Sequence, residues 1–192
     1  MDLWNSGSDD AKYVVGRAAS PDMKVNPSSK PIISNVDYVK FSALSFSMDT
    51  ANVKGLNQIF VQIHNRGLTP VSPNEAKVLM LVANGDSTIP PLPAGFASRI
   101  TAADSGKWLA PSAWKFATPE AAYRAFSGEL SARAPQIVEF KVNFKSLELV
   151  GPHAYVAVFV TALKDPLTSN EVNLDRLTQA SRHVAYRRLK LV

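Results

Sequence analysis

The sequence predicts an all-β fold in which two antiparallel sheets pack face to face. Short segments rich in β-branched and aromatic residues recur along the 192 residues, and 13 prolines are spread among and between them. Several of these segments alternate apolar and polar side chains, and strong helix signals are scarce. Many short strands with frequent turns and little helix are typical of two packed sheets.

Five segments carry the strand signals. Residues 59–64 alternate with a period of two, which predicts a strand with one buried face. Residues 78–82 are continuously apolar, as in a central strand covered on both faces. Residues 138–145 alternate most clearly, residues 154–161 are β-branched and aromatic, and residues 183–191 form a more polar last strand that suits a sheet edge.

The apolar positions of these strands predict the core. Side chains two apart along a strand lie on the same face of the sheet, so each alternating segment contributes one row. We expect the inner faces to be supplied by Ile59, Val61, Ile63, Val78, Met80, Phe140, Val142, Val156 and Val158.

Helix is expected in two places. The better candidate is 119–127, where Thr118 can cap the free amides, Pro119 suits the first helical position and Gly128 can end the helix. A weaker candidate is 174–180, just before the last strand.

The chain is expected to form one domain with embellishments. Residues 1–35 show little alternation of apolar and polar side chains, so we expect them to form an N-terminal arm packed on the domain. We expect residues 36–192 to form the sandwich itself. An insertion at about 84–135 separates two strands. Because structureless loops beyond about 12–15 residues are uncommon in compact domains and are often functional, we expect this long connection to have a function.

The insertion holds the candidate binding residues, which are Trp108, Trp114, Phe116 and Tyr123. Trp commonly anchors protein interfaces, so we expect these rings to form a partner-binding face. Two alternatives stay open. The first is that some of the rings pack on the sandwich, since exposing all of them would create a large apolar patch. The second is that exposed rings of Trp4, Trp108 or Trp114 stack on a sugar.

No catalytic apparatus is recognisable, and we expect no cofactor and no metal. The chain has no cysteine, and its three histidines, His64, His153 and His183, are dispersed. His-Glu-x-x-His, Gly-x-Ser-x-Gly and phosphate-loop motifs do not occur. The acids Asp9, Asp10, Asp86 and Asp165 could offer oxygens to calcium, but solvated turns explain them better.

The net charge of +5 raises the question of nucleic acid. Basic residues are scattered, with one concentration at Arg182, Arg187, Arg188 and Lys190. A strand there places cations on both faces with Tyr186 as its only aromatic residue, whereas single-strand binders combine rings and cations on one face. We therefore expect no nucleic-acid partner. No apolar stretch is long enough for a membrane span, and Met1–Asn5 lacks the start of a signal peptide.

Several segments together resemble the bacterial immunoglobulin-like modules of the CARDB type, the cell-adhesion-related domains. The resemblance rests on Asp2–Ser6, on the strand Ile59–Gly67 with its Asn-Arg-Gly ending, on Asp165–Leu167, and on the closing segment Arg182–Leu189. The sequence departs from the family pattern at Ser181, Arg182 and His183, where acidic and amide residues are expected, and the insertion is outside the resemblance.

The resemblance implies an immunoglobulin-like antiparallel β-sandwich, here with a long inter-strand insertion carrying a short helix. It also implies a non-catalytic module, often appended to secreted or cell-surface proteins and to hydrolases, and it transfers no functional residues. We expect an interaction, spacer or assembly module whose partner is a protein or a neighbouring domain of a larger chain. The alternative is a carbohydrate-binding or adhesion domain.

Overall fold

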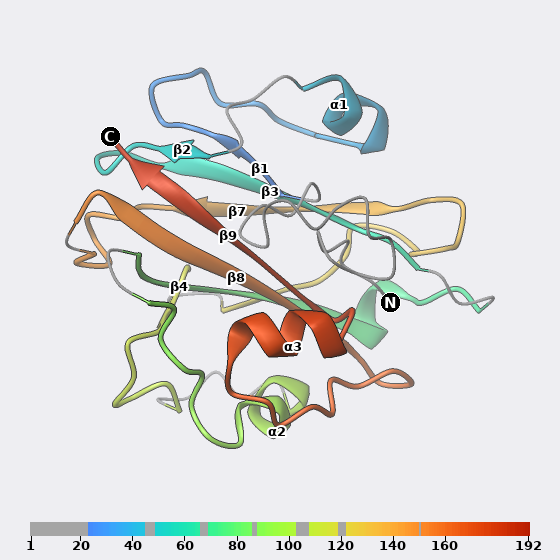
Figure 1. Cartoon of the computed structure of the whole chain (residues 1–192). Helices are drawn as coiled ribbons and strands as arrows, with labels where there is room; N and C mark the ends of the chain where they lie inside the picture. Colours follow the sequence, from blue (N-terminus) through green and yellow to red (C-terminus); the bar gives the residue numbers. More distant parts are fainter. Residues whose placement is uncertain are drawn as a thin grey trace.

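The described residues form mainly two β-sheets, with three short α-helices outside them (Figure 1). The computed structural model describes residues 23–44, 49–65, 69–85, 88–102, 108–118, 122–149 and 151–192. All described strand pairs are antiparallel except the pair β2–β9. The all-β prediction is therefore confirmed at the level of a β-rich fold with two sheets.

The smaller sheet has three strands in the order β1-β3-β7. These are β1 (Met23–Asn26), β3 (Asn57–Ile63) and β7 (Gln136–Val142). The predicted alternation of β7 holds, because Val138, Phe140 and Val142 are buried between the sheets while Lys141 is exposed.

The larger sheet has the order β2-β9-β8-β4-β5, and β6 also pairs with β4. Its strands are β2 (Thr50–Ala51), β9 (Val184–Leu191), β8 (His153–Ala162), β4 (Ala76–Asn84), β5 (Lys115–Phe116) and β6 (Tyr123–Arg124). A short 3-10 helix, Pro73–Glu75, leads into β4. The sheet is thus built around the three long strands β9, β8 and β4, and it ends in very short strands.

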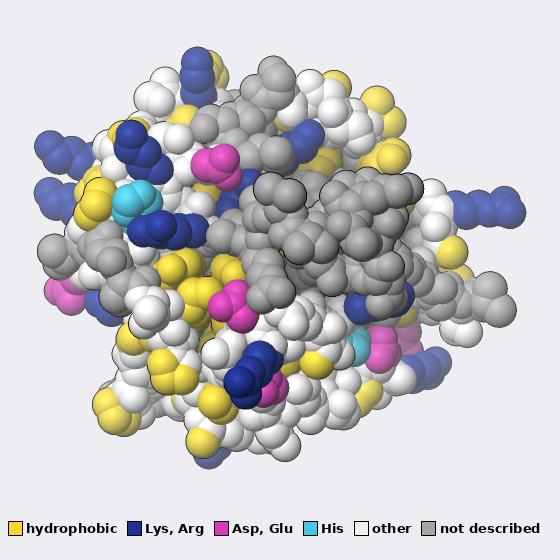
Figure 2. Space-filling model, viewed as in Figure 1, with side chains coloured by type: hydrophobic (Ala, Val, Ile, Leu, Met, Phe, Trp, Pro, Cys, Tyr) yellow, Lys and Arg dark blue, Asp and Glu magenta, His cyan; other side chains and the backbone are white. Residues whose placement is uncertain are grey.

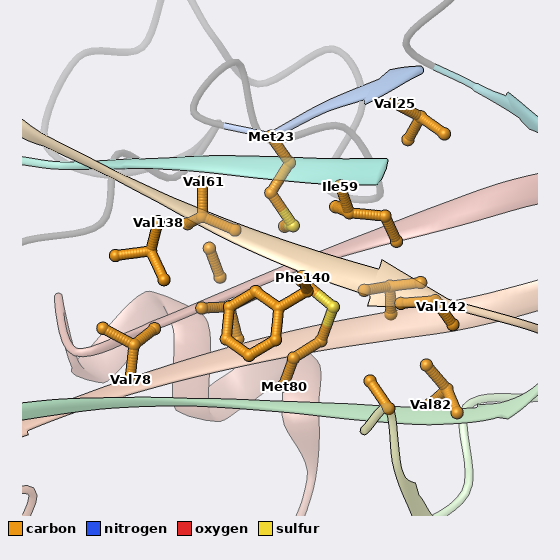
Figure 3. Close-up of a cluster of buried hydrophobic side chains, with 14 of the residues drawn as sticks. Met23, Val25, Ile59, Val61, Val78, Met80, Val82, Val138, Phe140 and Val142 are labelled. Carbon is orange, nitrogen blue, oxygen red and sulfur yellow. The ribbon is translucent and has the colours of Figure 1, made fainter. Parts of the chain in front are cut away.

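One apolar core joins the two sheets. All nine side chains expected on the inner faces belong to it, so this prediction is confirmed. Phe140 from β7 lies at its centre, next to Met80 from β4 (Figure 3), and its exposed fraction is 0%.

Helices cover the outer faces of the sheets. The larger sheet carries α2 (Phe96–Thr101) and α3 (Leu174–Ala180) on its outer face, where a second apolar cluster forms (Figure 1). The smaller sheet carries α1 (Tyr38–Ala43), whose Phe41 is buried. Asn173 caps α3 by accepting a hydrogen bond from the backbone N–H of Arg176 at 3.1 Å, which fixes where this helix begins.

The helix expected at 119–127 is wrong for the described part of that segment. Residues 119–121 lie outside the described residues, and Tyr123–Arg124 form β6 on the edge of β4. The insertion does carry a short helix, but at 96–101. The second helix prediction, 174–180, is confirmed as α3.

Some expectations at the two ends of the chain can be placed. Met23–Asn26, from the expected N-terminal arm, form β1 of the smaller sheet, whereas residues 1–22 lie outside the described residues. The last strand, β9, is flanked by β8 and by the short β2, so it is not the edge strand that its polarity suggests. Among the described helices, none has the length and apolarity needed to cross a membrane.

Candidate functional site

Much of the described part of the insertion packs on the outer face of the larger sheet, whereas Ala117, Phe126 and Leu130 belong to the core between the sheets. Leu92, Phe96 and Ile100 are buried there in the second apolar cluster. The backbone N–H of Leu92 donates to the carbonyl of Val172 at 2.9 Å, which ties the proline-rich stretch to the segment before α3. These described stretches therefore form a packed layer on the sheet, in which the aromatic residues of the second apolar cluster have defined places.

Trp114 lies inside this layer. Its exposed fraction is 1%, and its indole Nε1–H donates to the carbonyl of Pro90 at 3.1 Å. A buried indole with its single donor satisfied is the usual arrangement of a core tryptophan. Of the four residues expected at a partner-binding face, Trp114 thus serves the packing of the insertion, and its ring does not reach the surface.

Trp108 and Phe116 form an aromatic pair that is only partly buried. Their ring centroids lie 5.7 Å apart with an interplanar angle of 81°, which is an edge-to-face contact. Both rings pack against the second apolar cluster from outside. Phe116 belongs to β5 and pairs with Leu81 on β4, so a strand of the larger sheet fixes its position.

Tyr123 extends this pair along the edge of β4. It belongs to β6 and pairs with Leu79, two residues from the partner of Phe116, so both rings lie on the same face of the sheet in adjacent rows. The hydroxyl of Tyr123 donates to the carbonyl of Arg99 on α2 at 3.4 Å. We call Trp108, Phe116 and Tyr123 the aromatic strip.

The side chain of Lys115, next to Phe116 in the sequence, is held in place by two contacts. Lys115 precedes Phe116, and its Nζ donates to the carbonyl of Leu147 at 2.6 Å and lies 3.6 Å from a carboxylate oxygen of Glu148. These contacts connect β5 to the turn after β7. Phe116 and Tyr123 are therefore held by short strands paired with β4, and Trp108 contacts the ring of Phe116.

One Ser-His-Asp contact exists that the sequence did not predict. Nε2 of His183 lies 3.0 Å from a carboxylate oxygen of Asp165, and its Nδ1 lies 3.4 Å from Oγ of Ser181. The same hydroxyl oxygen accepts a hydrogen bond from the backbone N–H of His183 at 3.3 Å, as in a serine turn. The contacts join the turn before β9 to the segment after β8. Only the fold could reveal them, because Asp165 is distant in sequence.

The remaining candidates are shallow or lie elsewhere. A groove of about 410 Å³ runs beside α1 and the start of β7, lined by residues including Asp37, Lys40 and Gln136. Within the described ranges, no group of three or more His, Asp or Glu side chains is placed to hold a metal ion. Of the acids weighed for calcium, Asp9, Asp10 and Asp86 lie outside the described residues.

Comparison with known proteins adds no relative. No protein-family model matches the chain, and no curated protein matches it. The aromatic strip is the part of the expected binding face that is only partly buried.

Proposed function

We propose that this chain is a non-catalytic interaction module with an immunoglobulin-like fold. The strand order supports the fold assignment. The order β1-β3-β7 corresponds to strands A, B and E of an immunoglobulin sandwich, and β9-β8-β4-β5 corresponds to G, F, C and C′. The resemblance of several segments to CARDB-type modules is in line with this assignment, and with a place in a secreted or cell-surface protein.

The single observation that carries the proposal is the half-buried aromatic strip on the insertion. Aromatic side chains bury much area with few rotatable bonds, and they are enriched where proteins meet. The edge-to-face contact of Trp108 with Phe116 presents two rings at a steep angle, with centroids 5.7 Å apart. Rings at this steep angle offer no single flat face on which a sugar ring could stack, so a protein partner is favoured and a glycan is the alternative.

A comparison of two tryptophans tests this proposal. We expect Trp114→Ala to lower the free energy of unfolding by about 3–5 kcal/mol, the cost of emptying a core site of this size. Trp108→Ala should cost less than half as much, because its ring is only partly buried. Urea unfolding followed by circular dichroism measures both values.

The binding arm of the test uses the folded variants. A partner protein that binds the wild-type chain should no longer bind the Trp108→Ala variant. It should still bind the Tyr38→Ala variant, because Tyr38 is 47% exposed on α1, away from the strip. If Trp108→Ala unfolds the domain as strongly as Trp114→Ala does, the strip belongs to the core and the proposal fails. Binding to a glycan array that is lost with Trp108→Ala would favour the carbohydrate alternative.

A further inference from the structure

Four loop and strand ends come together at the end of the molecule where β9 finishes. The backbone N–H of Lys190 donates to the carbonyl of Asp49 at 2.6 Å, and that of Val53 donates to the carbonyl of Val192 at 2.9 Å. The N–H of Lys145, after β7, donates to the carbonyl of Val53 at 3.1 Å. These backbone hydrogen bonds hold the end as one surface rather than as separate loops.

This surface is rich in cations. Lys54, Lys145, Arg188 and Lys190 are exposed, and His153 pairs directly with Lys190 across β8 and β9. In Figure 2, Lys and Arg side chains gather around a His at the end where Figure 1 marks the C-terminus. We call Lys54, Lys145, Arg188 and Lys190 the basic end.

The acids at this end are already engaged elsewhere. Asp49 binds Nη1 of the buried Arg187 at 2.8 Å, and Glu148 lies 3.6 Å from Nζ of Lys115. Within the part of the chain that the structure describes, no carboxylate forms an ion pair with the four cations of the basic end. The basic end therefore carries several cations that form no ion pair with a described carboxylate, and an anionic partner would supply such pairs.

We propose that the basic end binds an acidic segment of a protein partner. The proposal rests on the proposed function in one respect, namely that the chain is an interaction module, but it concerns a different surface from the aromatic strip. Leu56, 43% exposed and two residues from Lys54, adds an apolar contact beside the cations. The segment that fits is a short peptide with several carboxylates and an aliphatic residue.

The buried state of the tyrosines favours a peptide over other polyanions. Tyr155 pairs with Arg188 across the strands but is only 7% exposed, and Tyr186 is 3% exposed. Single-stranded nucleic acid is bound by stacking its bases on exposed rings. Bilayer interfaces are likewise enriched in Trp and Tyr. An acidic peptide needs neither, because charge and one apolar contact suffice to align it.

The experiment uses a defined probe and a matched pair of variants. A fluorescein-labelled peptide of twelve residues, with eight Asp or Glu and two Leu, is titrated with the wild-type chain, and binding is followed by anisotropy. The double variant R188Q/K190Q should bind it roughly twofold to thirtyfold more weakly, from the loss of two exposed ion pairs. The control R133Q/R176Q changes the net charge equally, at exposed residues away from the basic end, and should lose less than about twofold.

A second variant guards against a local change in fold. Arg188 donates from Nε to the carbonyl of Gly85 at 3.0 Å, so its replacement could disturb β9. K54Q/K145Q removes two cations whose side chains form no hydrogen bond or ion pair with the described residues, and it should weaken binding to a similar degree. Higher salt should weaken the wild-type complex, and a peptide with Ser in place of Asp and Glu should not bind.

Several results would overturn the proposal. One such result is that the acidic peptide does not bind the wild-type chain. Another is that R188Q/K190Q and R133Q/R176Q lose equal affinity for the peptide, which would mean that only net charge matters. Tighter binding of duplex DNA or of phosphatidylserine vesicles than of the peptide, lost in R188Q/K190Q, would replace the partner class. Trp108→Ala should leave the peptide affinity unchanged, so failure of the aromatic strip and failure of the basic end are distinguishable.

Discussion

The buried Arg187 allows a sharp test of how the core tolerates charge. It lies on β9 between Ala185 and Leu189, which both belong to the core between the sheets, and only 1% of its side chain is exposed. Its Nη1 donates to Oδ1 of Asp49 at 2.8 Å, whereas the side chain of Asp49 is 71% exposed. A buried cation is thus compensated in part by an anion that remains in water.

This asymmetry sets the expected magnitudes. Removing one partner of a fully buried pair costs about 3–5 kcal/mol, whereas an exposed pair is worth about 0.2–1 kcal/mol. Asp49→Asn keeps an acceptor but removes the charge, so we expect a loss of about 1–2 kcal/mol, between these limits. Arg187→Met replaces the charge with an apolar chain of similar length, and we expect it to stay within about 1 kcal/mol of the wild type.

The assay is a double-mutant cycle measured by urea unfolding at neutral pH. Asp49→Asn should cost about 1–2 kcal/mol in the wild type and almost nothing in the Arg187→Met background, because the cation that needs Asp49 is then absent. An equal cost in both backgrounds would refute the reasoning, since Asp49 would then act independently of the guanidinium. A larger loss for Arg187→Met than for Asp49→Asn would show that the guanidinium itself stabilises the fold.

Two further predictions follow from the core and from the entry to β4. Phe140→Ala should lower the free energy of unfolding by about 3–5 kcal/mol, because its ring is fully buried between the sheets; a loss below about 1 kcal/mol in urea unfolding would contradict this placement. The pKa of the Glu75 carboxyl is lowered, first by the hydrogen bond from the backbone N–H of Ser72 and next by the charge of Lys164. Its stabilising effect should therefore be present above the ordinary pKa of glutamate and disappear as the pH falls through the lowered value. Wild type should be more stable than Glu75→Gln at pH 7 and equal to it at low pH, and a gap that persists in acid would contradict this.

Strand alternation allowed much of the sheet core to be predicted, because a period of two determines which face each side chain occupies. Ile59, Val61 and Phe140 were placed correctly for this reason. The same rule also applies to Arg187 in the last strand. Arg187 has the same parity as Leu189, so the alternation itself predicts an inward-facing cation there.

The helices show where local sequence patterns fail to predict the secondary structure. Capping residues around 119–127 favour a helix, yet β4 offers an unpaired edge nearby and Tyr123 pairs with Leu79 instead. Tertiary pairing therefore outweighs local preference at this point. The helices α1 and α2 have six residues each, too few for a helical period to be visible in the sequence.

The candidate site was predictable in location but not residue by residue. The insertion and its aromatic residues were identified from length and composition. Which tryptophan is buried depends on the carbonyl of Pro90, which receives the indole N–H of Trp114 at 3.1 Å. That contact spans 24 residues, and no local pattern encodes it.

The position of β9 has a consequence for how the domain assembles during synthesis. The strand is made after both of its neighbours, yet it lies between β2 and β8 and supplies Ala185, Leu189 and Leu191 to the core. Until residue 191 has left the ribosome, β8 keeps an open edge and the apolar interior lacks one wall. An unpaired edge beside exposed apolar surface is prone to pair with another chain. The growing chain therefore passes through an unfinished state that ends only when β9 pairs with β8 and closes the sheet.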